Sequence, residues 1–386
     1  MEELEKFNPL AVSSKFAICG LPIRMDTYRY CTFGCKYCFS NNRKIMEFEK
    51  KICVGDAEWL EKKLCRVESN GADKTNFLDT LIEKGITFHC GGMADPFQPC
   101  EEKLKATEEC VDICNKHGRS ILFSTKTDTV YGVNVREDLH TFQLSITGAP
   151  KDVEPNVPNL EKRIEFFRQL KKDGFKVGIR LQPFIPNVTT LDIVKEFQGA
   201  DNFTIEGIKI VPQNEEAKIY ILKRFGFRFE DFKQMGLLNL LPEIRMHYYK
   251  PFIDYFEKYG IPYSIADNDM HHLGTNYCCC GDGLVKNTLL INNTTMCHLY
   301  GKNYAKEQLD KMIDREGVRD CKCSDLFTSN RTNGCESVQD FYNMRFYQES
   351  SPFSPLFLHT DDKETGQMSI FDFMEGGDSE EEGYGS

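Results

Sequence analysis

Three cysteines near the start of the chain have a spacing that suits an iron–sulfur cluster. Cys31, Cys35 and Cys38 lie in the stretch RYCTFGCKYCFSNNR, with three and then two residues between them. Three thiolates on one short loop can ligate three irons of a cubane [4Fe–4S] cluster and leave the fourth iron without a protein ligand. A zinc knuckle or three buried thiols are the alternatives, but a structural zinc ion takes four ligands. The spacing therefore favours a [4Fe–4S] cluster with one open iron.

The composition agrees with ligation of a metal by thiols. The chain has 386 residues, of which 17 are cysteines. The N-terminal stretch lacks the basic-then-apolar pattern of a signal peptide, and no apolar run approaches the ~18 residues of a membrane span. We therefore expect a cytoplasmic protein with no membrane partner. A reducing compartment disfavours disulfides and leaves the thiols for metals.

The net charge of −11 is concentrated at the C-terminal end of the chain. Residues 361–386 contain nine acidic residues and one lysine, which leaves a charge of only −3 on the rest. A nearly neutral body neither predicts nor excludes a local basic groove for nucleic acid.

Strand-like apolar runs alternate with helix-period segments up to about residue 267. Two of the intervening segments, Glu101–His117 and Asn159–Asp173, have clear helical periodicity. Alternation of this kind builds a parallel sheet. Six repeats predict an α/β fold, a partial (β/α)6 barrel whose chemistry lies at the C-terminal ends of the strands. The expected strands are Arg24–Tyr30, Ile86–Gly92, Ser120–Lys126, Phe142–Gly148, Lys176–Phe184, Thr204–Pro212 and Tyr263–Asp267.

The pattern changes after the last of these strands. We expect residues 1–270 to form the barrel and residues 271–346 to form an extension that holds seven of the cysteines. Residues 347–386 are rich in proline and serine and then acidic, which predicts a disordered tail.

The cysteine motif resembles that of the radical S-adenosylmethionine (SAM) superfamily. The spacing, the aromatic Tyr37 before the last cysteine and the position after the first strand all match. The family fold is a partial (β/α)6 barrel. The resemblance implies that the open iron binds the amino and carboxylate groups of SAM. One-electron reduction then cleaves SAM to methionine and a 5′-deoxyadenosyl radical, with a flavodoxin or ferredoxin as the electron donor.

Other positions match family contacts to SAM. The stretch Gly91-Gly92-Met93 resembles the Gly-Gly-Glu motif, whose backbone receives the amino group, with Met in place of Glu. Ser145 and Arg180, at the ends of two strands, match polar contacts to SAM. Ser145 can equally be a sheet hydroxyl with a local partner. Arg180 lies in an apolar strand, where a buried charge requires an anionic partner.

Within the superfamily, several segments resemble the spore photoproduct lyase and DNA-repair-photolyase-like branch. The most specific is Asp95–Pro99 in the stretch HCGGMADPFQPCE. Lyases of this branch use a cysteine to return a hydrogen atom to the product radical. Cys90 and Cys100 are the candidates for that role. The alternative for each is a small buried apolar side chain.

The cysteines of the extension resemble the opening of SPASM and twitch modules, which hold auxiliary [4Fe–4S] clusters. A cysteine run precedes a short hairpin, and another cysteine ends it. The expected ligands of a second cluster are Cys280, Cys297, Cys321 and Cys323. The Cys-x-Cys spacing of the last two departs from the usual Cys-x2-Cys. A zinc site and no metal remain alternatives.

The tail contains a short motif that connects with the DNA hypothesis. Gln367–Phe371, with the sequence QMSIF, resembles the bacterial sliding-clamp-binding pentapeptide. An exposed motif of this kind can bind as an extended peptide. The sequence thus favours a radical SAM enzyme, lyase or oxidoreductase-like, that repairs or modifies a DNA base. The alternative is a radical SAM enzyme with an auxiliary cluster that modifies a peptide, a protein or a small molecule.

Overall fold

The computed structural model describes residues 4–13, 19–42, 51–235, 237–267, 269–276, 278–281, 283–289, 314, 317–322 and 335–343. Its described part is built on an eight-stranded sheet with the order β14-β10-β9-β8-β7-β6-β3-β2. Neighbouring strands are parallel from β14 to β3, and only β2 is antiparallel to β3. The strands are β2 Leu10–Val12, β3 Ile23–Met25, β6 Phe88–Cys90, β7 Ile121–Thr125, β8 His140–Ser145, β9 Lys176–Phe184, β10 Asn202–Gly207 and β14 Tyr263–Ile265.

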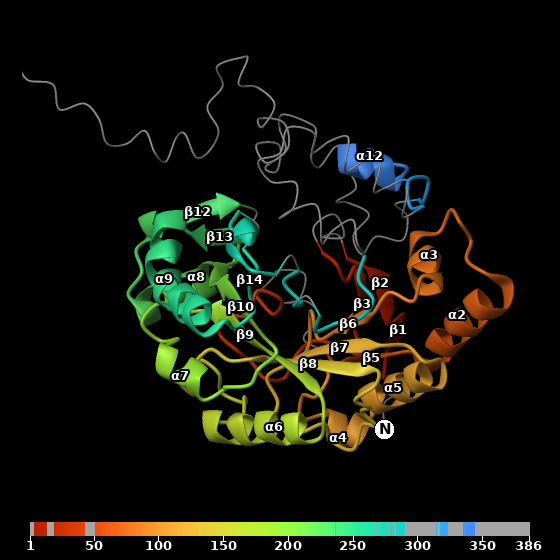
Figure 1. Ribbon diagram of the computed structural model, residues 1–386, viewed down its shortest axis with the longest axis horizontal. Helices are drawn as coiled ribbons and strands as arrows, with labels where there is room; N and C mark the ends of the chain where they lie inside the picture. Colours follow the sequence, from red (N-terminus) through yellow and green to blue (C-terminus); the bar gives the residue numbers. More distant parts are fainter. Residues whose placement is uncertain are drawn as a thin grey trace, which may run out of the picture.

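The strand order of this sheet follows the order along the chain. Winding in one direction is the arrangement of a barrel, whereas a doubly wound sheet reverses at a switch point. Because β14 and β2 form the two edges, the sheet remains open. Figure 1 shows the strands in an arc with helices α5, α6 and α7 along its outer side. The predicted α/β partial barrel is confirmed.

Helices connect most of the strands and cover the outer face. Two small sheets accompany them, with the orders β1-β5-β4 and β11-β13-β12. Their strands are β1 Lys6–Phe7, β4 Tyr28–Arg29, β5 Cys53–Gly55, β11 Lys209–Ile210, β12 Phe232–Met235 and β13 Leu237–Leu240. The helices are α2 Ala57–Asn70, α3 Phe77–Glu83, α4 Glu101–Leu104, α5 Ala106–Lys116, α6 Leu160–Lys172, α7 Leu191–Lys195, α8 Glu215–Phe225, α9 Pro242–Tyr259 and α12 Val338–Tyr342.

Helix α6 forms as its sequence predicts. The Asn159 side chain accepts a hydrogen bond from the backbone N–H of Lys162 at 3.2 Å and so caps the N-terminus. Ile164, Phe167 and Leu170 are buried on one face of the helix. Gly174, just beyond the C-terminal end, has a φ of +89°, which glycine adopts at little cost.

The predicted helix over residues 101–117 is instead two helices, α4 and α5. Lys105 separates them with a φ of +55°. The buried carboxylate of Glu101 accepts hydrogen bonds from the backbone N–H groups of Thr107 at 3.0 Å and Glu108 at 2.8 Å. Glu101 therefore supplies the N-terminal cap of α5, and the chain bends at Lys105 to allow it.

The two faces of the sheet differ in character. One face packs on the helices, and its side chains include Cys90, Phe123, Phe142 and Ile179 in the main hydrophobic core. The opposite, inner face carries polar side chains at alternate positions, because successive residues of a strand point to opposite sides. These inner residues include His89, Ser124, Gln143, Arg180 and Thr204.

A segment from the expected extension, residues 276, 278–281 and 283–289, packs against this inner face. The backbone carbonyl of Cys279 accepts hydrogen bonds from Gln143 at 3.3 Å and Thr204 at 2.9 Å. The carbonyl of Cys278 accepts one from Ser264 at 3.0 Å. In Figure 1 this segment crosses the inside of the arc after β14. The inner polar residues are thus partly satisfied by the chain itself.

The described helices include none that is both long enough and apolar enough to cross a membrane.

Candidate active site

The three motif cysteines lie on one loop that follows β4, after strand β3 of the main sheet. β3 is parallel to β6, and the turn Gly91–Met93 follows β6. Because parallel strands end at the same edge of a sheet, this places the cysteine loop beside the glycine turn. Cys35 is buried, and Cys31 and Cys38 are half-buried.

Side-chain amides fix the backbone of the cysteine loop. The buried Gln98 accepts hydrogen bonds from the Thr32 backbone N–H at 2.7 Å and the Thr32 hydroxyl at 2.9 Å. Gln98 also donates to the carbonyl of Tyr30 at 3.2 Å. Asn41 donates to the carbonyl of Cys31 at 3.1 Å, and Asn156 donates to that of Thr32 at 2.8 Å. Gln98 belongs to the Asp95–Pro99 stretch that the sequence singles out, but its role was not predicted.

A buried carboxylate anchors the other end of the loop. Glu154 accepts hydrogen bonds from the Tyr37 hydroxyl and, at 3.0 Å, from Thr147. Its cationic neighbours are Lys126 at 3.2 Å and Arg163 at 3.8 Å. Burial raises the pKa of Glu154, but the two cations together with the hydrogen bonds from Tyr37 and Thr147 outweigh burial, and the net pKa is lowered. The aromatic residue of the cysteine motif is therefore held by an ionised glutamate.

The surroundings of the thiols fit an iron–sulfur cluster. Burial raises the pKa of Cys31, and the nearby backbone N–H groups of Asp95 and Phe33 act in the opposite direction. The backbone N–H of Asn41 donates to the Cys38 sulfur at 3.5 Å. Such N–H···S bonds tune cluster potentials, and soft thiolates select iron–sulfur clusters or zinc. Burial raises the pKa of Cys35 to about 12, so a bound cation is required for this sulfur to be a thiolate at neutral pH.

The turn after β6 requires a glycine at its first position. Gly91 has a φ of +98°, and a Cβ built there would lie 2.0 Å from the backbone oxygen of Ser124. Asp95 holds the rest of the turn to β7 by accepting from Thr125 at 2.7 Å and from the Lys126 backbone N–H at 2.7 Å. Met93 lies near the cysteine loop, with its sulfur 4.0 Å from the Ser40 hydroxyl.

A row of polar side chains crosses the inner face from β6 to β10. His89 Nε2 lies 2.8 Å from the Ser124 hydroxyl, which donates to Gln143 Oε1 at 3.4 Å. Arg180 donates to the same Gln143 oxygen at 3.1 Å and lies 3.8 Å from Glu206. Burial and the charge of Arg180 lower the pKa of His89 to about 4, so this imidazole is neutral at pH 7.

The predicted SAM contacts are distributed along this edge of the sheet. Gly91, Gly92 and Met93 form the turn, and Ser145 ends β8 directly opposite Arg180 on β9. The anionic partner that Arg180 requires is provided by Glu206, a residue the sequence analysis did not select. Glu206 also bonds to Gln182 and Lys209. His89 and Gln143 were likewise missed, although their alternation with apolar neighbours identifies them as inner-face residues.

The two candidate hydrogen-atom donors occupy different environments. Cys90 is fully buried in the core between the sheet and the helices, where Cys110 and Cys114 also lie. This placement favours the alternative of a buried apolar side chain. Cys100 is half-buried and packs on the small cluster of Tyr28, Val54, Ala94 and Ala106, against which Cys31 also packs. The structure therefore brings Cys100, but not Cys90, close to the cysteine loop.

The expected ligands of a second cluster are not brought together where the structure describes them. Cys280 packs inside the sheet with Leu21, Leu122 and Leu284. Cys321 lies in the main core, where its thiol contacts the carbonyl of Lys74 at 3.4 Å. Cys297 and Cys323 lie outside the described residues. The ligand set of Cys280 with Cys321 therefore does not fit one cluster.

A different set of thiols surrounds Cys280. Cys19, Cys278 and Cys279 pack in the same group inside the sheet. Hydrogen bonds from Cys278 and Cys280 lower the pKa of Cys279. Cys19 lies just before the first barrel strand, far from Cys280 along the chain. The sequence alone therefore gave no sign that the two cysteines lie in one group.

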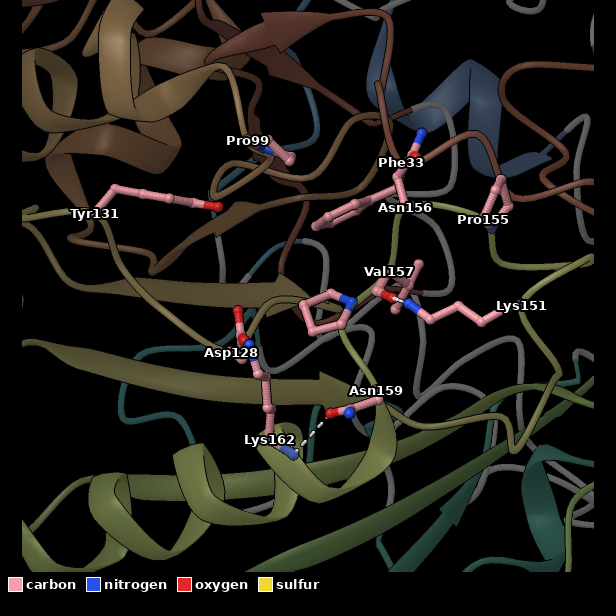
Figure 2. A pocket seen from close by; sticks show the side chains of 11 residues that line it. Phe33, Pro99, Asp128, Tyr131, Lys151, Pro155, Asn156, Val157, Asn159 and Lys162 are labelled. Carbon is pink, nitrogen blue, oxygen red and sulfur yellow. Dashed lines mark hydrogen bonds between the residues drawn. The ribbon is translucent and has the colours of Figure 1, made fainter.

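A pocket of about 340 Å³ opens beside the cysteine loop. Phe33, from that loop, forms one wall, and Tyr131, Lys151, Asn156 and Lys162 line the rest with six further residues. Figure 2 shows these side chains arranged around the hollow. The lining carries two lysines, one aspartate (Asp128) and the Tyr131 ring. Lys151 donates to the carbonyl of Val157, and Phe33 is only 2% exposed.

Comparison with solved structures finds similar folds among radical SAM enzymes. Spore photoproduct lyase, in a variant with bound AdoMet and dinucleoside spore photoproduct, has a TM-score of 0.48 and 14% sequence identity, covering 64% of this chain and 76% of that chain. SuiB of Streptococcus suis has a TM-score of 0.40 and 13% identity, covering 65% of this chain and 50% of that chain.

Among curated sequences, an uncharacterized protein of Methanocaldococcus jannaschii is 23% identical over 222 residues, which is 55% of this chain and 79% of that protein. No family model matches the chain.

Proposed function

We propose that this chain is a radical SAM enzyme that acts on a DNA base, in a lyase-type repair or a modification. The observation that carries the proposal is the loop with Cys31, Cys35 and Cys38, which lies beside the strained Gly91 turn at the end of a parallel sheet. A [4Fe–4S] cluster bound there supplies the electron for reductive cleavage of SAM. The chain's own contribution is to fix the three thiols through Gln98, Asn41 and Glu154.

The inner-face row would give SAM a polar environment. Arg180, which pairs with Glu206, adds a cation to this row, and the neutral His89 offers a hydrogen-bonding group without a charge. The backbone of Gly91–Met93 is accessible because Gly91 and Gly92 carry no side chain. Reduction requires a one-electron donor, for which a flavodoxin or ferredoxin is the expected class.

Two features support DNA as the substrate. The segments of residues 26–269 that resemble the photolyase-like branch include Asp95–Pro99, which supplies Gln98 and the Asp95 anchor. The pocket beside Phe33 carries Lys162 as a cation for a phosphate and Tyr131 as a ring for stacking, next to Asp128. Cationic grooves with aromatic rings bind nucleic acid through backbone charges and stacked bases.

The proposal is tested by anaerobic incubation of the reconstituted enzyme with SAM, a reductant and duplex DNA, both undamaged and ultraviolet-irradiated. We expect 5′-deoxyadenosine and a changed nucleoside in the digested DNA, detected by mass spectrometry. Affinity for DNA is expected to fall as salt concentration rises. If SAM is cleaved at the same rate with and without DNA, and the nucleosides are unchanged, the DNA substrate is wrong while the enzyme class stands.

A second candidate is a radical SAM enzyme that modifies a peptide, a protein or a small molecule with the help of an auxiliary cluster. The specific observation in its favour is that four thiols, those of Cys19, Cys278, Cys279 and Cys280, pack together on the inner face of the sheet. Iron that survives the loss of the Cys31–Cys38 cluster would favour this candidate.

The clamp-binding motif gives an independent prediction. Gln367–Phe371 lies outside the described residues. We expect the triple variant Gln367→Ala, Ile370→Ala and Phe371→Ala to lose binding to the sliding clamp and to cleave SAM at an unchanged rate, because tethering raises local concentration without altering chemistry. Surface plasmon resonance on an immobilised clamp measures the binding. A matched variant with Met368→Ala should still bind, since that position of the motif is variable. If the intact protein shows no binding at high micromolar concentration, the motif is coincidental.

A further inference from the structure

Away from the candidate active site, three metal-ligand side chains converge between helices α2 and α5. Glu61 and Cys65 are one helical turn apart on α2, so they share a face. His117 follows the last residue of α5. One carboxylate oxygen, the thiol sulfur and one imidazole nitrogen of these residues all lie within 4.8 Å of one another. This group is called the α2–α5 cluster below.

The distances within the cluster resemble those around a small divalent cation. The Cys65 sulfur lies 3.9 Å from His117 Nε2 and 3.8 Å from Glu61 Oε1. His117 Nε2 is 3.4 Å from Glu61 Oε2. A tetrahedral zinc ion with ordinary Zn–S, Zn–N and Zn–O bonds separates its ligand atoms by roughly 3.3–3.6 Å. The two contacts of Glu61 use different carboxylate oxygens, and one common set of three ligand atoms lies within 4.8 Å, so the side chains must move closer together to enclose a zinc ion.

A second layer of charges orients the histidine. His117 Nδ1 lies 2.7 Å from Glu68 Oε2, and Arg119 donates to the other oxygen of Glu68 at 2.8 Å. Metal-bound histidines commonly donate their second ring N–H to a carboxylate in this way. With the Nδ1 proton on the Glu68 side, the Nε2 lone pair faces Cys65 and Glu61. In the metal-free protein the Cys65 thiol can donate its proton to Glu61 Oε1, and a metal ion would replace this proton.

We propose that Glu61, Cys65 and His117 bind a zinc ion that ties α2 to α5, with water as the fourth ligand. Three protein ligands leave the fourth position of the ion open to water, so the site differs from a closed structural zinc site with four protein ligands. Both helices pack on the core beneath the sheet, and neither contributes a residue to the cysteine loop. Lys116 pairs with Glu61 and has an exposed side chain, so it can withdraw as zinc binds. The rival arrangement is a protonated His117 that bridges Glu61 and Glu68 without metal.

The experiment measures the alkylation rate of Cys65 in the full-length, cluster-reconstituted protein, with and without Zn²⁺. Peptide mass spectrometry follows Cys65 separately from the other cysteines. Because a zinc-bound thiolate is shielded from the reagent, we expect zinc to slow alkylation of Cys65 strongly in the unmodified protein. His117→Gln and Glu61→Gln should abolish the protection. Glu68→Gln should weaken apparent zinc affinity about 10–100-fold, the usual cost of losing a partner of a ligating histidine.

Glu58→Gln is the matched control, because Glu58 lies on the same helix and pairs with Lys62 away from the cluster. In the Glu58→Gln variant, zinc should protect Cys65 from alkylation as strongly as it does in the unmodified protein. The proposal is overturned if Cys65 of the unmodified protein is alkylated at the same rate with and without zinc. This outcome does not depend on the folding of any variant. The proposal is also overturned if zinc still protects Cys65 in the His117→Gln variant, since zinc would then bind Cys65 without His117 as a ligand.

Discussion

Simultaneous replacement of Cys31, Cys35 and Cys38 by alanine is expected to abolish the reductive formation of 5′-deoxyadenosine from SAM. The reason is that these three thiols lie on one loop beside the Gly91 turn. Without them nothing retains the iron that binds SAM. The measurement is chromatographic quantitation of 5′-deoxyadenosine after anaerobic incubation with dithionite, together with iron analysis of the protein.

Cys114→Ala provides the control, because it removes a buried thiol of the main core without altering the loop. It should retain SAM cleavage. Iron that remains in the triple variant would be assigned to the thiols of Cys19 and Cys278–Cys280. Cleavage by the triple variant at the rate of the unmodified protein would contradict the proposed enzyme class.

Replacement of Gly91 by alanine is expected to be severe. The new Cβ would lie 2.0 Å from the Ser124 backbone oxygen, and the φ of +98° is unfavourable for any other residue. Strain and overpacking at one site together cost about 2–5 kcal/mol in free energy of unfolding. Relief by movement of the turn would displace Met93 from the cysteine loop. We therefore expect both lower stability and loss of SAM binding, measured by chemical denaturation and by isothermal titration calorimetry.

The adjacent glycine makes a matched comparison. A Cβ at Gly92 would meet only the Arg24 guanidinium, at 4.0 Å, and the residue does not have a positive φ. Gly92→Ala should change stability by less than about 1 kcal/mol. Equal effects of the two substitutions would show that the close approach of Gly91 to β7 does not matter.

The barrel could be predicted from sequence because its signals are local. Apolar runs and helix periodicity located each parallel strand, and caps such as Asn159 fixed the ends of helix α6. The break between α4 and α5 escaped because it depends on Glu101 turning back to cap the following helix. In the sequence Glu101 stands in the first turn of one apparent helix, and the helical periodicity of the apolar residues continues across the bend.

The candidate site was predictable only where its residues are adjacent in sequence. The cysteine loop and the Gly91–Met93 turn are short motifs. The pairing of Arg180 with Glu206 depends on neighbouring strands, and the grouping of Cys19 with Cys280 depends on a segment that returns from the far end of the chain. Spacing alone grouped Cys280 with Cys321, and the structure places them in separate clusters.

The packing of residues 276, 278–281 and 283–289 inside the sheet has a consequence for synthesis on the ribosome. Strands β3 to β14 can pair one after another as they emerge, because their spatial order matches their order of translation. Gln143, Thr204 and Ser264, however, find their carbonyl partners only when Cys278 and Cys279 have left the exit tunnel. At roughly 5–20 residues per second, the nascent sheet exposes this face for several seconds. The inner face of the main sheet is therefore covered only after all of the strands of that sheet have been made.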